Sequence, residues 1–133
     1  MGRLAVVLVL VGAAGCASDM PSFVSVLLPG DTFDTVGPYR VEAEVLAPNG
    51  VLRVTLRLFP GDDPEVYSDL PFTAIEEDKT GGEFYVELPG RPVGTVFRFY
   101  LQVVDGKRGG GGKIAVFPSG APDDLATFSV LSP

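Results

Sequence analysis

The chain has 133 residues and a formal net charge of −7, with one cysteine, no histidine and no tryptophan. This length suits a single domain, and an acidic chain without a basic stripe argues against nucleic acid as a partner. Because histidine is absent, Ser-His-Asp and Cys-His nucleophilic sites and histidine-ligated zinc are excluded, so we expect no enzyme, no cofactor and no metal site.

The first sixteen residues have the pattern of an export signal. Arg3 gives the start a positive charge, residues 4–11 are apolar, and the small residues 12–15 lead directly to Cys16. A charged start, a short apolar segment and a small-residue cleavage region are typical of a secretory signal peptide. The apolar stretch is shorter than the roughly 20 residues that a transmembrane helix needs. We therefore predict a signal peptide over residues 1–15.

The residues around the cysteine resemble the lipobox of bacterial lipoproteins. Ala14, Gly15 and Cys16 fit that pattern, whereas Ala13 stands where it usually has leucine. The resemblance implies a lipid on Cys16, which also accounts for a lone thiol that has no disulfide partner within the chain. The alternatives are cleavage before Cys16 without a lipid, or cleavage before Ser18, which discards the cysteine.

The lipobox resemblance implies an exported protein that is held on a membrane through its N-terminal lipid. Residues 16–21 would form the lipidated cysteine and a short tether. In bacteria with two membranes, aspartate directly after the cysteine commonly signals retention in the inner membrane. Ala17 and Ser18 stand there instead, which favours the outer membrane.

From residue 22 onward, short apolar runs alternate with glycine, proline and polar residues. Alternation with a period of two predicts half-buried strands, and no run shows sustained helical periodicity. The expected strands are residues 22–28, 39–47, 51–59, 83–88, 95–104, 114–117 and 126–131, with short edge strands at 66–68 and 72–75. This pattern predicts an all-β fold for residues 22–133, an antiparallel β-sandwich of about seven strands.

Two of the predicted strands carry the clearest division into an inner and an outer face. In the strand over residues 51–59, the expected inward side chains are Leu52, Val54, Leu56 and Leu58. In the strand over residues 95–104, they are Phe97, Phe99, Leu101 and Val103. We expect these side chains to fill the space between the two sheets.

The segment from Leu88 to Gly106 resembles the E–F connection and F strand of fibronectin type III and related immunoglobulin-like domains. It contains a Leu-Pro-Gly turn, a Gly-Thr pair at residues 94–95 and the alternating strand that begins at Phe97. The resemblance extends over residues 38–131 and implies an immunoglobulin-like sandwich. Phe97 stands where the family usually has a tyrosine whose hydroxyl bonds back to the loop, and the family's core tryptophan is missing.

The outward residues of the strand over 95–104 form the candidate binding face. They are Arg98, Tyr100 and Gln102, with Tyr85 expected on the neighbouring strand. Arg and Tyr are common anchors at protein interfaces, so we expect a non-catalytic binding module that contacts an envelope protein. A surface polysaccharide is the alternative ligand, which requires an exposed aromatic platform around Tyr85 and Tyr100. An ordinary solvated sheet face is the third interpretation.

Three acidic clusters and one glycine-rich segment are predicted to be solvated turns and loops. The acidic clusters at residues 62–65, 76–78 and 123–124 lack the spacing of a calcium loop, although calcium bridged between loops stays an alternative. A two-carboxylate hydrolase would need two acids within about 10 Å in a cleft. Residues 107–113 lack the Gly-Lys-Ser/Thr of a phosphate loop, and we expect a mobile loop there.

Overall fold

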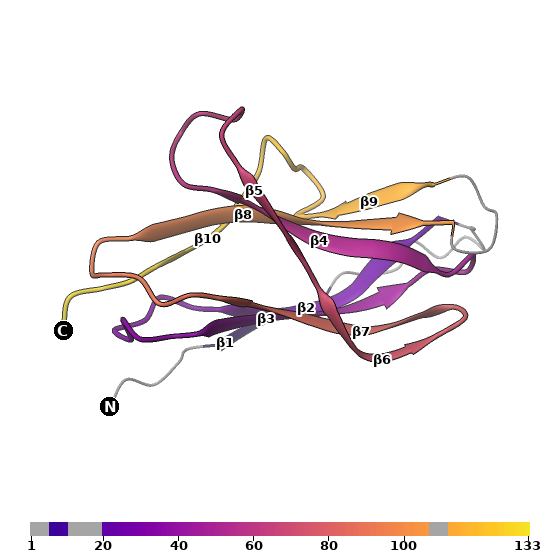
Figure 1. The fold of residues 1–133 in the computed structure, drawn as a ribbon, viewed down its shortest axis with the longest axis horizontal. Helices are drawn as coiled ribbons and strands as arrows, with labels where there is room; N and C mark the ends of the chain where they lie inside the picture. Colours follow the sequence, from indigo (N-terminus) through magenta and orange to yellow (C-terminus); the bar gives the residue numbers. More distant parts are fainter. Residues whose placement is uncertain (1–5, 11–19, 107–111) are drawn as a thin grey trace.

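Two antiparallel sheets packed face to face make up the fold (Figure 1). This computed structural model describes residues 6–10, 20–106 and 112–133. The strands are β1 (Val6–Leu10), β2 (Ser22–Pro29), β3 (Tyr39–Leu46), β4 (Val51–Phe59), β5 (Ser68–Pro71), β6 (Thr73–Asp78), β7 (Gly81–Leu88), β8 (Val96–Asp105), β9 (Ile114–Phe117) and β10 (Ala126–Ser129). The first sheet has the order β1-β2-β3-β7-β6, and the second has the order β10-β8-β4-β5 with β9 also paired to β8. The predicted all-β antiparallel sandwich is confirmed.

The strand boundaries follow the turn residues of the sequence closely. β4 and β9 coincide with the predicted ranges, and β2, β3, β7 and β8 begin and end close to them. The described residues form ten strands rather than about seven, because β5 and β6 add a short strand to the edge of each sheet and β1 adds one more to the first. Within the described ranges, no helix is long and apolar enough to cross a membrane.

β1 comes from the segment predicted to be a signal peptide. Its backbone pairs antiparallel with β2, from Val6 opposite Pro29 to Leu10 opposite Ser25. Cys16 and most of the expected tether lie outside the described residues, as do residues 107–111 of the glycine-rich segment. The predictions of a lipid on Cys16 and of a mobile glycine loop therefore stay predictions.

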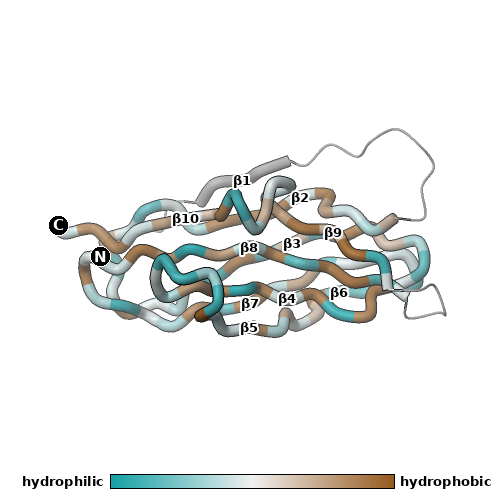
Figure 2. The backbone as a smooth tube through the Cα atoms, turned by 90° about the horizontal axis from the view of Figure 1, so that it is seen from above, coloured by the Kyte–Doolittle hydropathy of each residue, from teal (hydrophilic) through white to brown (hydrophobic). Residues whose placement is uncertain are grey.

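The expected inner face is confirmed for β8 and needs one correction in β4. Phe97, Phe99, Leu101 and Val103 are all buried. In β4, however, Leu52 is 54% exposed, and Val51 enters the core in its place. The cause is a β-bulge between residues 51 and 53, where an extra residue shifts the alternation by one position. Figure 2 shows how apolar and polar residues are distributed along the strands.

An aromatic cluster fills one end of the core between the sheets. The ring of Tyr39 on β3 meets Phe97 and Phe128 edge to face, with centroids 5.3 and 5.4 Å apart. Phe97 and Phe128 stack at 4.5 Å across the β8–β10 pair, and Phe99 meets Phe128 edge to face at 6.1 Å. Such pairs add specific geometry to the burial of a large apolar area.

The hydroxyl of Tyr39 joins this cluster to two loops. It donates a hydrogen bond to the carbonyl oxygen of Asp34 at 2.6 Å and accepts one from the backbone N–H of Arg91 at 3.2 Å. The same two loops touch where Gly90 packs on the backbone of Val36, leaving no room for a side chain at residue 90. Tyr39 thus anchors the connection that precedes β8, where Phe97 has no hydroxyl to do so.

We expect Tyr39→Phe to lower the free energy of unfolding by about 1–3 kcal/mol, because it removes two partly buried hydrogen bonds, to the N–H of Arg91 and to the carbonyl of Asp34. Chemical denaturation measures the change. Tyr85→Phe is the matched control, since its hydroxyl on the outer face of β7 has no hydrogen bond to the described residues. Equal stability of the Tyr39→Phe protein and the wild type would contradict the anchoring role.

Candidate functional site

The predicted outward row of β8 lies on the outer face of the second sheet, beside β4. In the antiparallel register, Arg57 stands opposite Tyr100, Phe59 opposite Arg98 and Thr55 opposite Gln102. Opposite residues on one face of a sheet are in side-chain contact distance, so β4 completes the row. Tyr100 is only 8% exposed. Arg98, Tyr100 and Gln102 are therefore brought together as predicted, but Tyr100 is covered by neighbours rather than solvated.

Tyr85 does not join this row. It lies on β7, which belongs to the first sheet and pairs with β3 and β6, so the expectation that it neighbours Tyr100 is wrong. Its ring lies beneath the guanidinium of Arg40, whose Cζ atom is 3.9 Å from the ring centroid. The two tyrosines that a sugar-binding platform would require are thus on opposite sheets of the sandwich.

Three residues outside the predicted row complete a cluster on this face. The ring of Phe59 lies 6.0 Å from those of Tyr67 and Tyr100, and the Arg57 guanidinium lies 3.8 Å above the Tyr67 ring. We name the set the outer-face cluster: Arg57, Phe59, Tyr67, Arg98 and Tyr100. The sequence signal for Arg57 and Phe59 is their outward position on a strand, whereas Tyr67 was expected in a short edge strand over residues 66–68 and lies in the loop before β5.

An ion pair fixes the position of Arg57 in the outer-face cluster. Its Nε and Nη2 atoms donate to the two carboxylate oxygens of Asp69 on β5 at 2.8 and 2.9 Å. These hydrogen bonds lower the pKa of Asp69 below its ordinary value and raise the pKa of Arg57 further above its own. Because the planar guanidinium is held at two points, the ion pair keeps Arg57 over the Tyr67 ring.

A hollow of about 340 Å³ opens next to this cluster. Its floor comes from the sheet, and two loops that rise above the second sheet in Figure 1, between β4 and β5 and between β9 and β10, form its rim. The lining residues are Arg57, Phe59, Gly61, Asp62, Pro64, Arg98, Tyr100, Pro122 and Leu125. The hollow therefore combines ring and proline walls with two guanidinium groups.

Arg98 is the cation of the hollow whose ion-pair partner can be replaced. Its Nη1 atom contacts Asp62 at 3.1 Å, and the side chain of Asp62 is 94% exposed. A single ion pair with a solvated carboxylate contributes little to stability, so another acceptor can take the place of Asp62 at low cost. Chemically, the site can hold an apolar side chain against the rings while Arg98 receives a hydrogen-bond acceptor.

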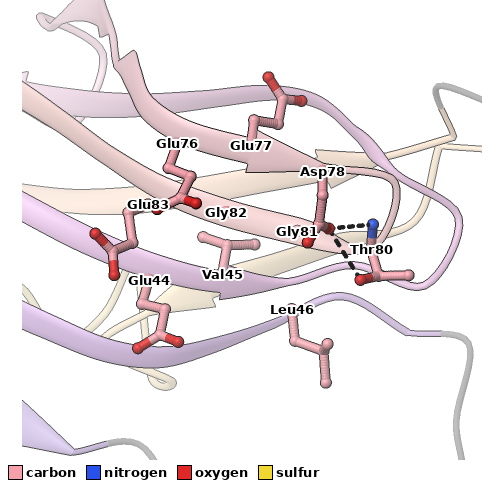
Figure 3. A pocket seen from close by; sticks show the side chains of 10 residues that line it. All are labelled: Glu44, Val45, Leu46, Glu76, Glu77, Asp78, Thr80, Gly81, Gly82 and Glu83. Carbon is pink, nitrogen blue, oxygen red and sulfur yellow. Dashed lines mark hydrogen bonds between the residues drawn. The ribbon is translucent and has the colours of Figure 1, made fainter.

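A second hollow, of about 290 Å³, lies on the first sheet and is acidic (Figure 3). Glu44, Glu83 and Glu76 stand opposite one another across β3, β7 and β6, so three like charges share one row. Asp78 accepts hydrogen bonds from the backbone N–H and the hydroxyl of Thr80, and these lower its pKa. Within the described ranges, no group of three or more acidic or cysteine side chains is placed to hold a metal ion.

The acidic cluster at residues 76–78 was expected in a turn, and the structure corrects this. Glu76 and Glu77 lie in β6, the edge strand of the first sheet, and Asp78 ends that strand before the turn. An edge strand keeps one side in water, so charged residues are tolerated there. A bulge lies between residues 74 and 76, directly before these charges.

Comparisons of the chain with protein-family models, with curated proteins and with solved structures find no match. The geometry of the described residues is therefore the basis on which the site is interpreted. That geometry favours the outer-face cluster and its hollow as the candidate site.

The ion pair between Arg57 and Asp69 predicts a specific acid dependence. The pKa of Asp69 is lower in the folded chain than its ordinary value of 3.8, so the pair stabilises the fold above that pH, and this stabilisation is lost as the pH falls through the lowered pKa. Because Asp69 is partly exposed, the contribution is under about 1 kcal/mol. Denaturation curves should show Asp69→Asn less stable than wild type at neutral pH, with the difference vanishing in acid. Asp123→Asn controls for the loss of one negative charge, and a pH-independent difference would contradict the assignment.

Proposed function

We propose that this protein is a lipid-anchored, non-catalytic binding module of the bacterial cell envelope that holds a partner protein at the outer-face cluster. The hollow between Arg57, Arg98 and the aromatic rings carries this proposal. Aromatic and arginine side chains that are held in place by their neighbours are typical anchors of protein interfaces. The partner would insert an apolar side chain between Pro64 and Leu125 and offer an acceptor to Arg98.

The proposed localisation rests on the sequence of the N-terminus. A charged start, an apolar run and small residues before Cys16 support export, and Cys16 itself supports lipidation. Residues 17–21 would then form a tether of at most roughly 17 Å when extended. Ala17 and Ser18 support the outer membrane rather than the inner one, if the cell has two.

The strand order supports the resemblance to immunoglobulin-like domains. The sequence β2-β3-β7-β6 in one sheet and β10-β8-β4 in the other corresponds to the A-B-E-D and G-F-C order of that architecture. The hydroxyl of Tyr39 bonds to the connection before β8, where the family uses a tyrosine of the following strand. We propose that the chain is a divergent member of this class.

The geometry favours a protein over a polysaccharide as the ligand. A sugar ring stacks on an open aromatic face, but Phe59 and Tyr100 are 5% and 8% exposed. Tyr67 is 44% exposed, and Arg57 already covers one face of its ring. The hollow also faces away from the first sheet, to which the tether is joined through β2, so it is accessible to a partner above the membrane.

The proposed localisation predicts that Cys16→Ser abolishes the incorporation of labelled fatty acid into the protein, because the acceptor thiol is lost. The measurement compares labelling of the wild type and the variant in a bacterial host. Ser18→Ala is the control and should keep its label. A mature N-terminus at Ser18, or equal labelling of wild type and Cys16→Ser, would contradict lipidation at this residue.

The binding site predicts a difference between two tyrosines on opposite sheets. A photo-crosslinking amino acid in place of Tyr67 should give a discrete protein adduct in intact cells, because residue 67 packs against Phe59 and Arg57, which line the hollow. The same amino acid in place of Tyr85 should give none. Arg98→Ala should weaken the adduct at residue 67, while Arg53→Ala on the same strand as Arg57 should not. An adduct at residue 85 alone would place the partner on the first sheet, and no adduct at either position would contradict a protein partner.

A further inference from the structure

Whether the first sheet has an unpaired edge at β2 depends on whether the N-terminal residues stay attached. In this structure β1 covers that edge with five antiparallel residue pairs, from Val6 opposite Pro29 to Leu10 opposite Ser25. Removal of residues 1–15, which the proposed function includes, takes β1 away. The backbone N–H and C=O groups on that side of β2 then lose the strand that pairs with them.

β2 differs from the other edges of the sandwich. Its eight residues, Ser22–Pro29, include no charged side chain. At the opposite edge of the same sheet, β6 carries three carboxylates and a bulge. The edges of the second sheet are β5, which ends in proline, and the short strands β9 and β10, each of four residues. Charged residues, proline, bulges and short length keep edge strands from pairing with other chains. Of these features, the half of β2 that pairs with β1 has only the proline at its end.

β1 also shows what kind of strand this edge accepts. The occupant is extended, antiparallel to β2 and, in sequence, composed of valine and leucine. At its centre, residue 8 stands opposite Leu27, with residue 7 opposite Leu28 and residue 9 opposite Val26. A replacement strand should therefore present three consecutive apolar residues in antiparallel register.

β2 of a second copy meets this requirement. When two β2 strands pair antiparallel about a two-fold axis at Leu27, Leu27 of the second copy takes the place of residue 8. Val26 and Leu28 of that copy then take the places of residues 7 and 9. We propose that the processed protein forms a symmetric dimer in which the two first sheets join through β2 into one continuous sheet. This inference rests on the removal of residues 1–15 in the proposed function.

Charge and tether geometry permit this dimer. The acidic residues nearest the axis, Glu42 and Glu44, lie on β3, so their counterparts are three strand spacings away, about 14 Å. This distance exceeds the screening length of about 8 Å at physiological salt. Each Ser22 lies five residues from the axis, which separates the two tethers by about 34 Å along the strands. Both lipids reach one membrane when the strands run parallel to its surface.

A disulfide across the axis tests the dimer in the cell envelope. In a dimer of the Leu27→Cys protein, the two introduced thiols stand directly opposite each other. The control is Leu52→Cys, which introduces a thiol on the bulge of β4 in the other sheet. After oxidation of intact cells, Leu27→Cys should run at twice the chain mass on a non-reducing gel, and Leu52→Cys should not. Monomeric Leu27→Cys, or a crosslink to a different protein, would overturn the proposal.

A second measurement tests the dimer independently of the proposed membrane anchoring and of the partner site. Detergent-extracted wild type should have twice the mass of one chain. The Leu27→Lys protein should have the mass of one chain, because two lysines would face each other across the dimer axis. The control, Leu52→Lys, should match wild type. The intact mass also shows whether residues 1–15 were removed. A processed, monomeric wild type overturns the dimer alone, and a retained leader overturns the proposed membrane anchoring and the dimer together. The photo-crosslink at residue 67 reads the partner site independently of both.

Discussion

The pairing of β4 with β8 is the interaction on which the rest of this structure depends. Along this register, Leu56 stands opposite Leu101 on the inner face, and Arg57 stands opposite Tyr100 on the outer face. Because side chains alternate across a strand, one set of backbone hydrogen bonds fixes both the core and the candidate site. A slip of one residue would exchange the two faces and bury the guanidinium groups, which the apolar core strongly opposes.

The sequence predicted the strands well because their apolar alternation is local. β4 and β9 were placed at their observed bounds, and the inner row of β8 was identified residue by residue. The phase of β4 near Leu52 was missed, because a bulge depends on how two strands pair and leaves no mark in the pattern of one strand. Local periodicity therefore predicts the strands and which side of each strand most residues face, but it does not predict irregular strand pairing.

The candidate site was predicted only in part, for a topological reason. The chain crosses from the second sheet to the first between β5 and β6, as Figure 1 shows, and this crossing puts Tyr85 on the other side of the sandwich from Tyr100. No property of the residues near Tyr85 reveals which sheet it joins. Tyr67 was missed for a related reason, since a loop residue is placed by contacts with Phe59 and Arg57 rather than by periodicity.

The two proposals assign different tasks to the two sheets, and this division has a consequence for binding. In an antiparallel β2–β2 pair the two-fold axis is perpendicular to the joined sheet, so both second sheets lie on the same side of it. Each copy would then present its hollow toward the same region above the membrane. A partner with two equivalent segments could engage both hollows, and the second contact would form at a high effective concentration. Weak binding at a single solvated cation such as Arg98 would suffice in that arrangement, because avidity rather than one tight contact would hold the partner.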